Sequence, residues 1–185
     1  MNHIRKDHMN IILGITGGIA AYKAPSIAAA LVSNGHTVKC VCTKSALMFV
    51  TEMSLATMSK NPVVTSLEDE VQGVVTHIEM TEWCDVFAVV PCTANFIGKV
   101  ANGIADDTLS TMYLAAFQEK DIRICPAMNS NMWEHYKVKD NLEEIHSRGV
   151  EVLEPAVGML ACGVEGKGKL PSTRKVVEFI QGEAS

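Results

Sequence analysis

Several patterns that would assign a function directly are absent from this chain of 185 residues. There is no Cys-x-x-Cys pair, and no histidines and cysteines stand at the spacing of a zinc site. The net charge is −5 and no basic run is present, which argues against a nucleic-acid partner. No apolar stretch is long enough to cross a bilayer, and the N-terminal residues lack a signal-peptide pattern. We therefore expect a cytoplasmic protein without a metal, a membrane partner or a nucleic-acid partner.

The six cysteines do not indicate a disulfide framework. Most lie in apolar runs that are typical of strands, such as residues 38–42 and 122–125, where a free cysteine behaves as a small buried hydrophobe. Cys162 differs because it lies in a glycine-rich segment with nearby lysines, where a thiol can be exposed and partly ionised. The alternative for Cys162 is a small apolar loop residue without a chemical role.

The remaining pattern predicts one α/β domain. The chain is 48% hydrophobic and 20% charged, as in a soluble globular protein, and it is long enough for one core. Apolar runs alternate with helical patterns, which is typical of a doubly wound parallel sheet. We predict a single three-layer Rossmann-like (flavodoxin-like) domain over residues 10–185, after a disordered leader at residues 1–9. The predicted strands are residues 11–13, 36–42, 86–90, 121–125 and 150–153, and residues 155–170 are predicted as a loop.

The first strand ends in a glycine turn at Gly14, Gly17 and Gly18, and a helical pattern over residues 19–34 follows at once. Glycines let the backbone approach a phosphate, and the N–H groups at a helix start supply donors and partial positive charge. The spacing does not fit the G-x-G-x-x-G pattern of dinucleotide-binding folds. The turn therefore favours a smaller phosphate ligand over NAD, although a βα turn without a ligand remains an alternative.

The second strand supports the same interpretation. It ends in Thr43-Lys44-Ser45, without the acidic residue that holds the ribose of a dinucleotide. The hydroxyls of Thr16, Thr43 and Ser45 are candidate donors to a phosphate. Thr43 and Ser45 are equally good candidates for ordinary helix N-caps.

Polar residues also follow two later strands, where an open α/β sheet builds its ligand site. His77, which precedes the strand at residues 86–90, is a candidate general acid or base, since its unperturbed pKa lies near neutrality, or else an exposed loop residue. Asn129 is a candidate for binding a carboxylate, and equally for capping a helical turn that begins at Asn131. Met128 and Met132 are typical of core filling, and near a strand end also of the wall around an aromatic cofactor.

Together these motifs resemble the homo-oligomeric flavin-containing cysteine decarboxylase family, from about Asn10 to the C-terminus. The motifs are, in order, Gly17-Gly18-Ile19-Ala20, Thr43-x-x-Ala46-x-x-Phe49, His77-Ile78, Pro91-x-Thr93-Ala94-Asn95, Gly103-Ile104-Ala105-Asp106-Asp107, Pro126-Ala127-Met128-Asn129-x-x-Met132-Trp133 and Leu160-Ala161-Cys162-Gly163. Each motif is weak alone, but their common order along the chain is specific.

The resemblance implies a cofactor, FMN, and a role for each matching residue. The implied FMN-binding residues are Gly17, Gly18, Ile19, Ala20, Thr43, Phe49, Thr93, Ala94, Asn95 and Phe96. The implied catalytic residues are His77, Cys162 and Asn129, and the implied substrate-binding residues are Ala127, Met128, Asn129 and Met132.

The implied reaction is the decarboxylation of 4′-phospho-N-pantothenoylcysteine to 4′-phosphopantetheine in coenzyme A biosynthesis. In such enzymes the substrate thiol is oxidised at FMN to a thioaldehyde, which lets the carboxylate leave because the resulting carbanion is delocalised. The enethiol is then reduced, with Cys162 in the place of the proton donor. Family members are homotrimers or larger assemblies such as homododecamers built from trimers, so the resemblance implies that some residues serve a neighbour's site.

Other functions fit parts of the same pattern. A peptidyl-cysteine decarboxylase of peptide-antibiotic maturation stops at the enethiol and does not need Cys162. A flavin prenyltransferase, an electron-transfer flavoprotein and a non-catalytic flavin-binding regulatory subunit are further alternatives. The chain also departs from the family's motifs at several positions. Thr93 replaces Ser and Phe96 replaces Thr, while Val164, Lys169 and Leu170 replace Asp, Arg and Met.

Overall fold

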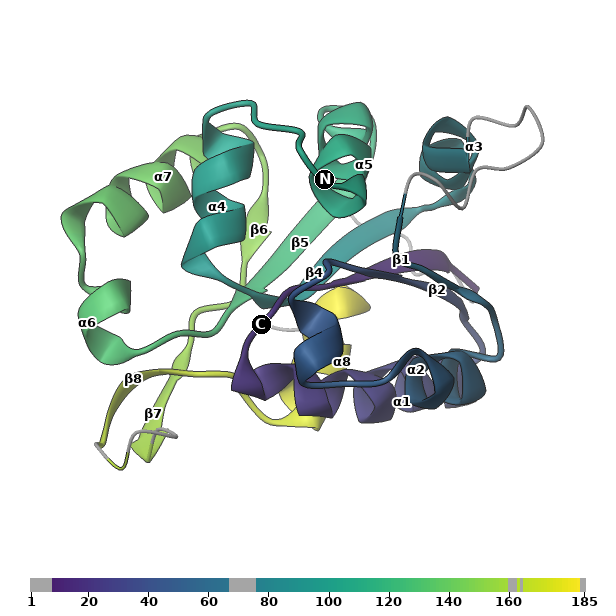
Figure 1. The fold of residues 1–185 in the computed structure, drawn as a ribbon, viewed down its shortest axis with the longest axis horizontal. Coiled ribbons are helices and arrows are strands. Elements are labelled where there is room, and N and C mark those ends of the chain that lie inside the picture. Colours follow the sequence, from purple (N-terminus) through teal and green to yellow (C-terminus); the bar gives the residue numbers. More distant parts are fainter. Residues whose placement is uncertain (1–7, 67–75, 160–162, 164, 184–185) are drawn as a thin grey trace.

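The computed structural model describes residues 8–66, 76–159, 163 and 165–183 (Figure 1). Within them a six-stranded parallel sheet has the order β3-β2-β1-β4-β5-β6, which confirms the predicted Rossmann-like class. The strands are β1 Asn10–Ile15, β2 Thr37–Cys42, β3 Val63–Val64, β4 Val86–Cys92, β5 Asp121–Pro126 and β6 Glu151–Val152. The short edge strand β3 was not predicted from the sequence.

Helices cover both faces of the sheet (Figure 1). One face packs on α1 Ala24–Ser33, α2 Glu52–Ser59 and α8 Thr173–Ile180. The other packs on α3 Thr76–Trp83, α4 Ala94–Ala101, α5 Thr108–Ala116 and α7 Tyr136–Ser147. Shorter helices are η1 Ile19–Lys23, η2 Ala46–Met48 and α6 Ser130–Trp133. None of the helices in the described ranges is both long and apolar enough to span a membrane.

The central strands are apolar because both of their faces are covered. In β1, Ile11 and Leu13 point to one helical layer and Ile12 to the other. Every residue of β4 is buried, as the continuous apolar run predicts for a central parallel strand. The strand continues two residues beyond the predicted end at Val90, so Thr93 is the first residue after it.

The helix predicted over residues 19–34 is divided in two. The first turn, η1, is a 3-10 helix, and α1 begins at Ala24 with Pro25 in its first turn. Proline favours the first turn of a helix because it has no N–H to donate. The division gives η1 its own direction, and η1 forms one wall of the site described below.

The predicted loop at residues 155–170 is wrong in part, because its two arms form a hairpin. Strands β7 Ala156–Met159 and β8 Glu165–Lys169 pair antiparallel. Glycine is unfavourable in strands, and the sequence therefore did not predict that these two segments pair. The hairpin is docked on the end of β5, where the N–H of Met128 donates to the carbonyl of Gly168 at 3.0 Å. Docking brings residues 168–170 to the carboxyl edge of the sheet.

A buried arginine attaches the last helix below the sheet. Arg123, 4% exposed on β5, donates from Nη1 to the carbonyls of Phe179 and Ile180 at 2.5 and 3.3 Å. These carbonyls lie at the C-terminal end of α8, and that of Phe179 also accepts from the N–H of Gly182 at 3.1 Å. Asp121 balances the charge of the guanidinium at 2.5 Å. Arg123 thereby fixes the helix that follows the hairpin and its connection.

Candidate functional site

The chain reverses its direction of winding between β1 and β4, and this is where open α/β sheets bind ligands. The segments after these neighbouring strands leave toward opposite faces, β1 into η1 and β4 into α4. Thr16, 1% exposed, joins the two strand ends. Its hydroxyl donates to the carbonyl of Pro91 at 2.7 Å and accepts from the N–H of Thr93 at 3.0 Å. The hydroxyl proton of Thr16 is thus donated to a backbone carbonyl. This corrects the expectation that Thr16 donates it to a phosphate.

We expect Thr16→Val to lower the free energy of unfolding by about 1–3 kcal/mol, because the N–H of Thr93 loses its acceptor in a buried place. Thr16→Ser keeps the hydroxyl and serves as the control. Urea denaturation of both variants measures the effect. Equal stability of Thr16→Val and the unsubstituted chain would contradict the role given to this hydroxyl.

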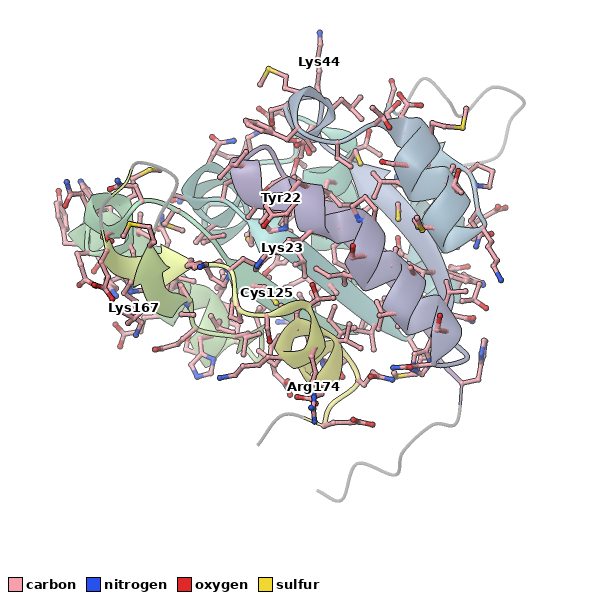
Figure 2. All side chains as sticks on the ribbon, turned by 90° about the horizontal axis from the view of Figure 1, so that it is seen from below. Tyr22, Lys23, Lys44, Cys125, Lys167 and Arg174 are labelled. Carbon is pink, nitrogen blue, oxygen red and sulfur yellow. The ribbon has the colours of Figure 1, made fainter. Side chains whose placement is uncertain are left out.

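A cavity of about 580 Å³ opens beside these strand ends, within the usual range for small-molecule sites. The structure brings together there predicted residues from three separate motifs: Gly17, Gly18, Ile19, Ala20, Thr93, Ala94, Ala127, Met128, Asn129 and Met132. The sequence did not assign the other lining residues to a site: Tyr22, Lys23, Pro91, Met159, Gly168, Lys169 and Leu170. Of these, Pro91, Lys169 and Leu170 lie in or beside the family motifs. Tyr22 and Lys23 lie on η1 (Figure 2). The sequence predicted one continuous helix over this segment, which did not indicate that these two side chains line the cavity.

The three glycines of the first turn have different roles. A Cβ on Gly14 would lie 2.6 Å from Leu109 Cδ1, so this glycine makes room for α5. A Cβ on Gly17 would lie 2.5 Å from the Cβ of Ser45, so this glycine makes room for the segment after β2. A Cβ on Gly18 would meet only Thr93 Cγ2 at 3.8 Å, an ordinary contact. Gly18 is therefore the glycine whose missing side chain leaves space in the cavity itself.

Asn129, three residues after the end of β5, also lines the first cavity. Its side-chain oxygen accepts from the N–H of Asn131 at 2.8 Å and caps α6. The predicted N-cap role is confirmed, with the helix beginning at Ser130, one residue earlier than expected. Asn129 also lines the cavity, so capping holds it in position there. The two alternatives weighed from the sequence are therefore compatible.

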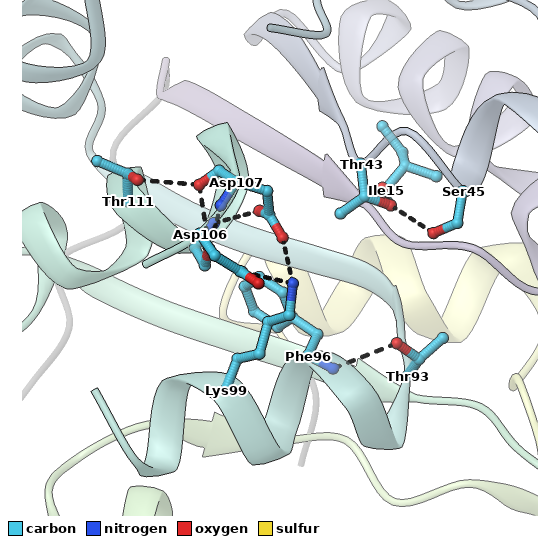
Figure 3. A network of polar contacts seen from close by, with 10 residues as sticks. Ile15, Thr43, Ser45, Thr93, Phe96, Lys99, Asp106, Asp107 and Thr111 are labelled. Atoms are coloured by element: carbon cyan, nitrogen blue, oxygen red, sulfur yellow. Dashed lines mark hydrogen bonds and ion pairs between the residues drawn. The ribbon is translucent and has the colours of Figure 1, made fainter. Parts of the chain in front are cut away.

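A second cavity of about 490 Å³ shares Thr93 with the first, and most of its lining residues have polar side chains. Its lining residues are Thr16, Thr43, Lys44, Ser45, Met48, Thr93, Asn95, Phe96, Lys99 and Asp107. The hydroxyls of Thr43 and Ser45 lie 3.1 Å apart (Figure 3). Thr93 accepts from the N–H of Phe96 at 3.4 Å and caps α4. Hydroxyls gathered at a helix start suit a phosphate or a polyol.

Lys99 supplies the main charge cluster of this second cavity. Its Nζ lies 2.6 Å from Asp106 and 2.7 Å from Asp107 (Figure 3). Burial would raise the pKa of Asp107, but hydrogen bonds from Lys99 and Ser110 outweigh it, and the pKa lies below its ordinary value. Asp107 also caps α5 through Ser110. The sequence placed both aspartates in a motif, but only the fold assigns them a partner.

Three predicted site residues are not among the described lining of either cavity. His77 lies half-buried in the first turn of α3, where its carbonyl accepts from the hydroxyl of Thr81. Phe49 ends η2 and is 39% exposed. Cys162 lies outside the described residues. Within one chain, neither His77 nor Phe49 is therefore among the described residues that line the cavities, although Phe49 directly follows Met48, which lines the second.

The five described cysteines are free and buried, as the interpretation of the strand cysteines predicted. Burial raises the pKa of Cys40 to about 12 and that of Cys84 to about 11. Cys92 and Cys125, at the ends of β4 and β5, are fully enclosed, and burial raises their pKa values further. These thiols stay protonated at neutral pH and belong to the core. Over the ranges given above, no group of three or more potential ligands gathers to hold a metal ion.

Comparison with known proteins gives matches along nearly the whole chain. The profile of the family described as Flavoprotein matches residues 2–185. The coenzyme A biosynthesis bifunctional protein CoaBC of Bacillus subtilis (strain 168) is 40% identical over 176 residues, which are 95% of this chain and 43% of CoaBC. The chain thus spans less than half the length of this curated relative.

Solved structures agree with the fold. A mutant PPC decarboxylase in complex with pantothenoylaminoethenethiol superposes with a TM-score of 0.85 and 27% identity, over 94% of this chain and 96% of that one. The FMN-dependent cysteine decarboxylase SpaF superposes with a TM-score of 0.81 and 27% identity, over 95% and 96%.

Proposed function

This chain belongs to the Flavoprotein family, and we propose that it is an FMN-dependent decarboxylase that converts 4′-phospho-N-pantothenoylcysteine to 4′-phosphopantetheine. The observation that carries the proposal is the 40% identity with CoaBC over 95% of this chain. CoaBC is described as bifunctional and is more than twice as long, so we assign one of its activities to this chain. The likeness to a PPC decarboxylase supports decarboxylation as that activity. Residues 10–185 then form one flavoprotein domain.

The residues around the two cavities fit FMN. Gly18 leaves its side of the first cavity open, and a Cβ there would meet little else. Thr43, Ser45 and Asn95 supply polar groups in the second cavity, which suits a phosphate and a ribityl chain. We assign the flavin ring to the first cavity, with Gly17–Ala20 and Thr93–Ala94 beside it. Bound FMN supplies two-electron redox chemistry, and the protein supplies placement and protons.

We assign three steps to side chains of this protein. Asn129 orients the substrate carboxylate, and a neutral amide does so without a full ion pair that would hold the departing group back. His77 accepts the proton of the substrate thiol, because an imidazole titrates near neutral pH. Cys162 donates a proton to the substrate carbon in the final reduction.

The positions of His77 and Phe49 favour an assembly in which a neighbouring subunit completes the site. Both residues lie outside the described cavity linings, whereas the resemblance gives both a role at the flavin. Large apolar side chains near the cavities are exposed, with Tyr22 61% and Met48 75% accessible. A homotrimer, or a homododecamer built from trimers, would cover such groups. Sedimentation at the 20.0 kDa of a single chain would contradict the assembly.

The product mass tests the function. We expect the purified flavin-loaded protein to convert 4′-phospho-N-pantothenoylcysteine to a product that has lost carbon dioxide and nothing else. We expect Cys162→Ser to release a product that lacks two further hydrogens, because the final protonation fails. An unchanged substrate mass with flavin-loaded protein would overturn the substrate assignment.

The competing function is a peptidyl-cysteine decarboxylase, which the similarity to SpaF favours. Such an enzyme stops at the enethiol, so its product has lost carbon dioxide and two hydrogens even with Cys162 present. A peptide with a C-terminal cysteine is the matched substrate for this alternative. Conversion of that peptide, together with no conversion of 4′-phospho-N-pantothenoylcysteine, would establish the peptidyl-cysteine decarboxylase in place of the proposed function.

A further inference from the structure

The first cavity carries an excess of positive charge that the chain as a whole does not have. The net charge of the protein is −5, yet the ionisable side chains among the described lining residues are Tyr22, Lys23 and Lys169. No carboxylate stands among those residues. A cavity lined by two cations in an acidic protein is suited to an anion.

Lys23 is held in place by the segment that follows the hairpin. Its Nζ donates to the carbonyls of Leu170 and Pro171, each at 3.3 Å. An ammonium group has three donors, so these two long bonds leave it capacity for another acceptor. Burial lowers the pKa of Lys23 from its ordinary value, and the nearby charge of Lys169 lowers it further. An anion bound between the two lysines would stabilise the charged form of Lys23 and so oppose both effects on its pKa.

Lys169, on β8, reaches the cavity from the other side. Its side chain lies across Gly158 on β7, where a Cβ would stand 3.4 Å from its Cδ and 3.7 Å from its Nζ. It has no ion pair with any residue of the described ranges. Other lysines nearby are neutralised: Lys167 pairs with Glu154 at 2.5 Å, and Lys99 pairs with two aspartates.

We propose that Lys23 and Lys169 together bind the phosphate monoester of the substrate in the first cavity. This inference rests on the proposed function and adds the group by which the substrate is selected. The hairpin contact between Met128 and Gly168 keeps Lys169 beside the segment that carries Asn129. One docked hairpin therefore couples the phosphate site to the carboxylate site.

The substrate carries two anionic groups, a carboxylate and a phosphate, and they behave differently during the reaction. Decarboxylation removes the charge from the carboxylate in the transition state, so two lysines on that group would stabilise the ground state more than the transition state. The phosphate keeps its charge throughout the reaction. Its binding energy is uniform, which predicts an effect of these lysines on KM and little effect on kcat.

The test compares binding of 4′-phosphopantetheine and pantetheine to the flavin-loaded protein by calorimetry. We expect the phosphorylated compound to bind more tightly, and Lys23→Met and Lys169→Met each to weaken it about 10-fold. Pantetheine binding should be unchanged in both variants. Lys167→Met removes the same charge from the same strand outside the cavity and is the matched control. Lys169→Met keeps the test decisive if Lys23→Met fails to fold.

Two results would overturn the phosphate site. One is equal affinity of the unsubstituted protein for the two compounds. The other is a loss of bound flavin in both lysine variants, which would assign the pair to the cofactor phosphate instead. Neither result depends on turnover, so the proposed function is decided separately by the product mass. Kinetics with phosphorylated substrate should then give a raised KM and an unchanged kcat in the lysine variants.

Discussion

Gly18→Ala will leave the protein as stable as before but with little bound flavin. The added methyl group meets only Thr93 at 3.8 Å within the protein, and the φ of −175° is extended backbone that any residue adopts. On its other sides the methyl group would face the cavity, so it would clash with the bound ligand and not with the protein. Overpacking of this kind costs about 2–3 kcal/mol, which corresponds to a roughly 100-fold rise in the dissociation constant of FMN. Fluorescence titration of the apoprotein with FMN measures it.

The matched variant is Gly17→Ala, one residue earlier in the same turn. Its Cβ would lie 2.5 Å from the Cβ and 2.8 Å from the backbone carbon of Ser45, which cannot swing away. We therefore expect Gly17→Ala to lower the unfolding midpoint, whereas Gly18→Ala does not. Full retention of flavin by Gly18→Ala, or a larger loss of stability there than at Gly17, would contradict the division of roles.

Gly168→Ala will abolish most decarboxylation while flavin stays bound. The φ of Gly168 is +145°, and its Cβ would overlap the carbonyl oxygen of Met128 and lie 3.3 Å from the carbonyl carbon. The hairpin would have to lift, which breaks the hydrogen bond from Met128 and moves both Lys169 and Asn129. Misplacing substrate-positioning groups by about 1 Å costs roughly 100-fold in rate. Steady-state kinetics and the flavin absorbance of the purified variant give the two readouts.

A control separates this clash from the general cost of a side chain at positive φ. Gly35 lies in the turn between α1 and β2 with a φ of +91° and no atom within 4 Å of a Cβ position. Gly35→Ala should therefore lose stability through backbone strain but keep its rate. If Gly168→Ala also keeps its rate, the hairpin is not needed to position the substrate.

Much of the site could be predicted because its position follows from local sequence and one rule of topology. Gly17, Thr93 and Asn129 each lie within three residues of the end of an apolar strand, and parallel strands end at the same edge of a sheet. The structure confirms that all three line one cavity. The N-cap at Asn129 was also readable, since a cap depends only on neighbouring residues.

Other features depend on contacts between segments that are distant in sequence. The hairpin at residues 156–169 forms in spite of its glycines, because pairing and docking on Met128 compensate for their poor strand propensity. The sequence placed Lys169 in a family motif but could not bring it to Lys23, which is 146 positions earlier in the chain. The three glycines of the first turn looked equivalent, although each faces a different neighbour.

The amino-acid sequence by itself determined the class of fold, the strand ends where ligands bind and the family, because each rests on periodicity or on motifs within short segments. The tertiary structure alone decided which glycine faces the cavity, which lysines share it and which aspartates neutralise Lys99. It also left His77 and Phe49 outside the described cavity linings. The physical reason is that steric fit and electrostatic balance are properties of neighbours in space, and chain folding sets those neighbours only after the strands are paired.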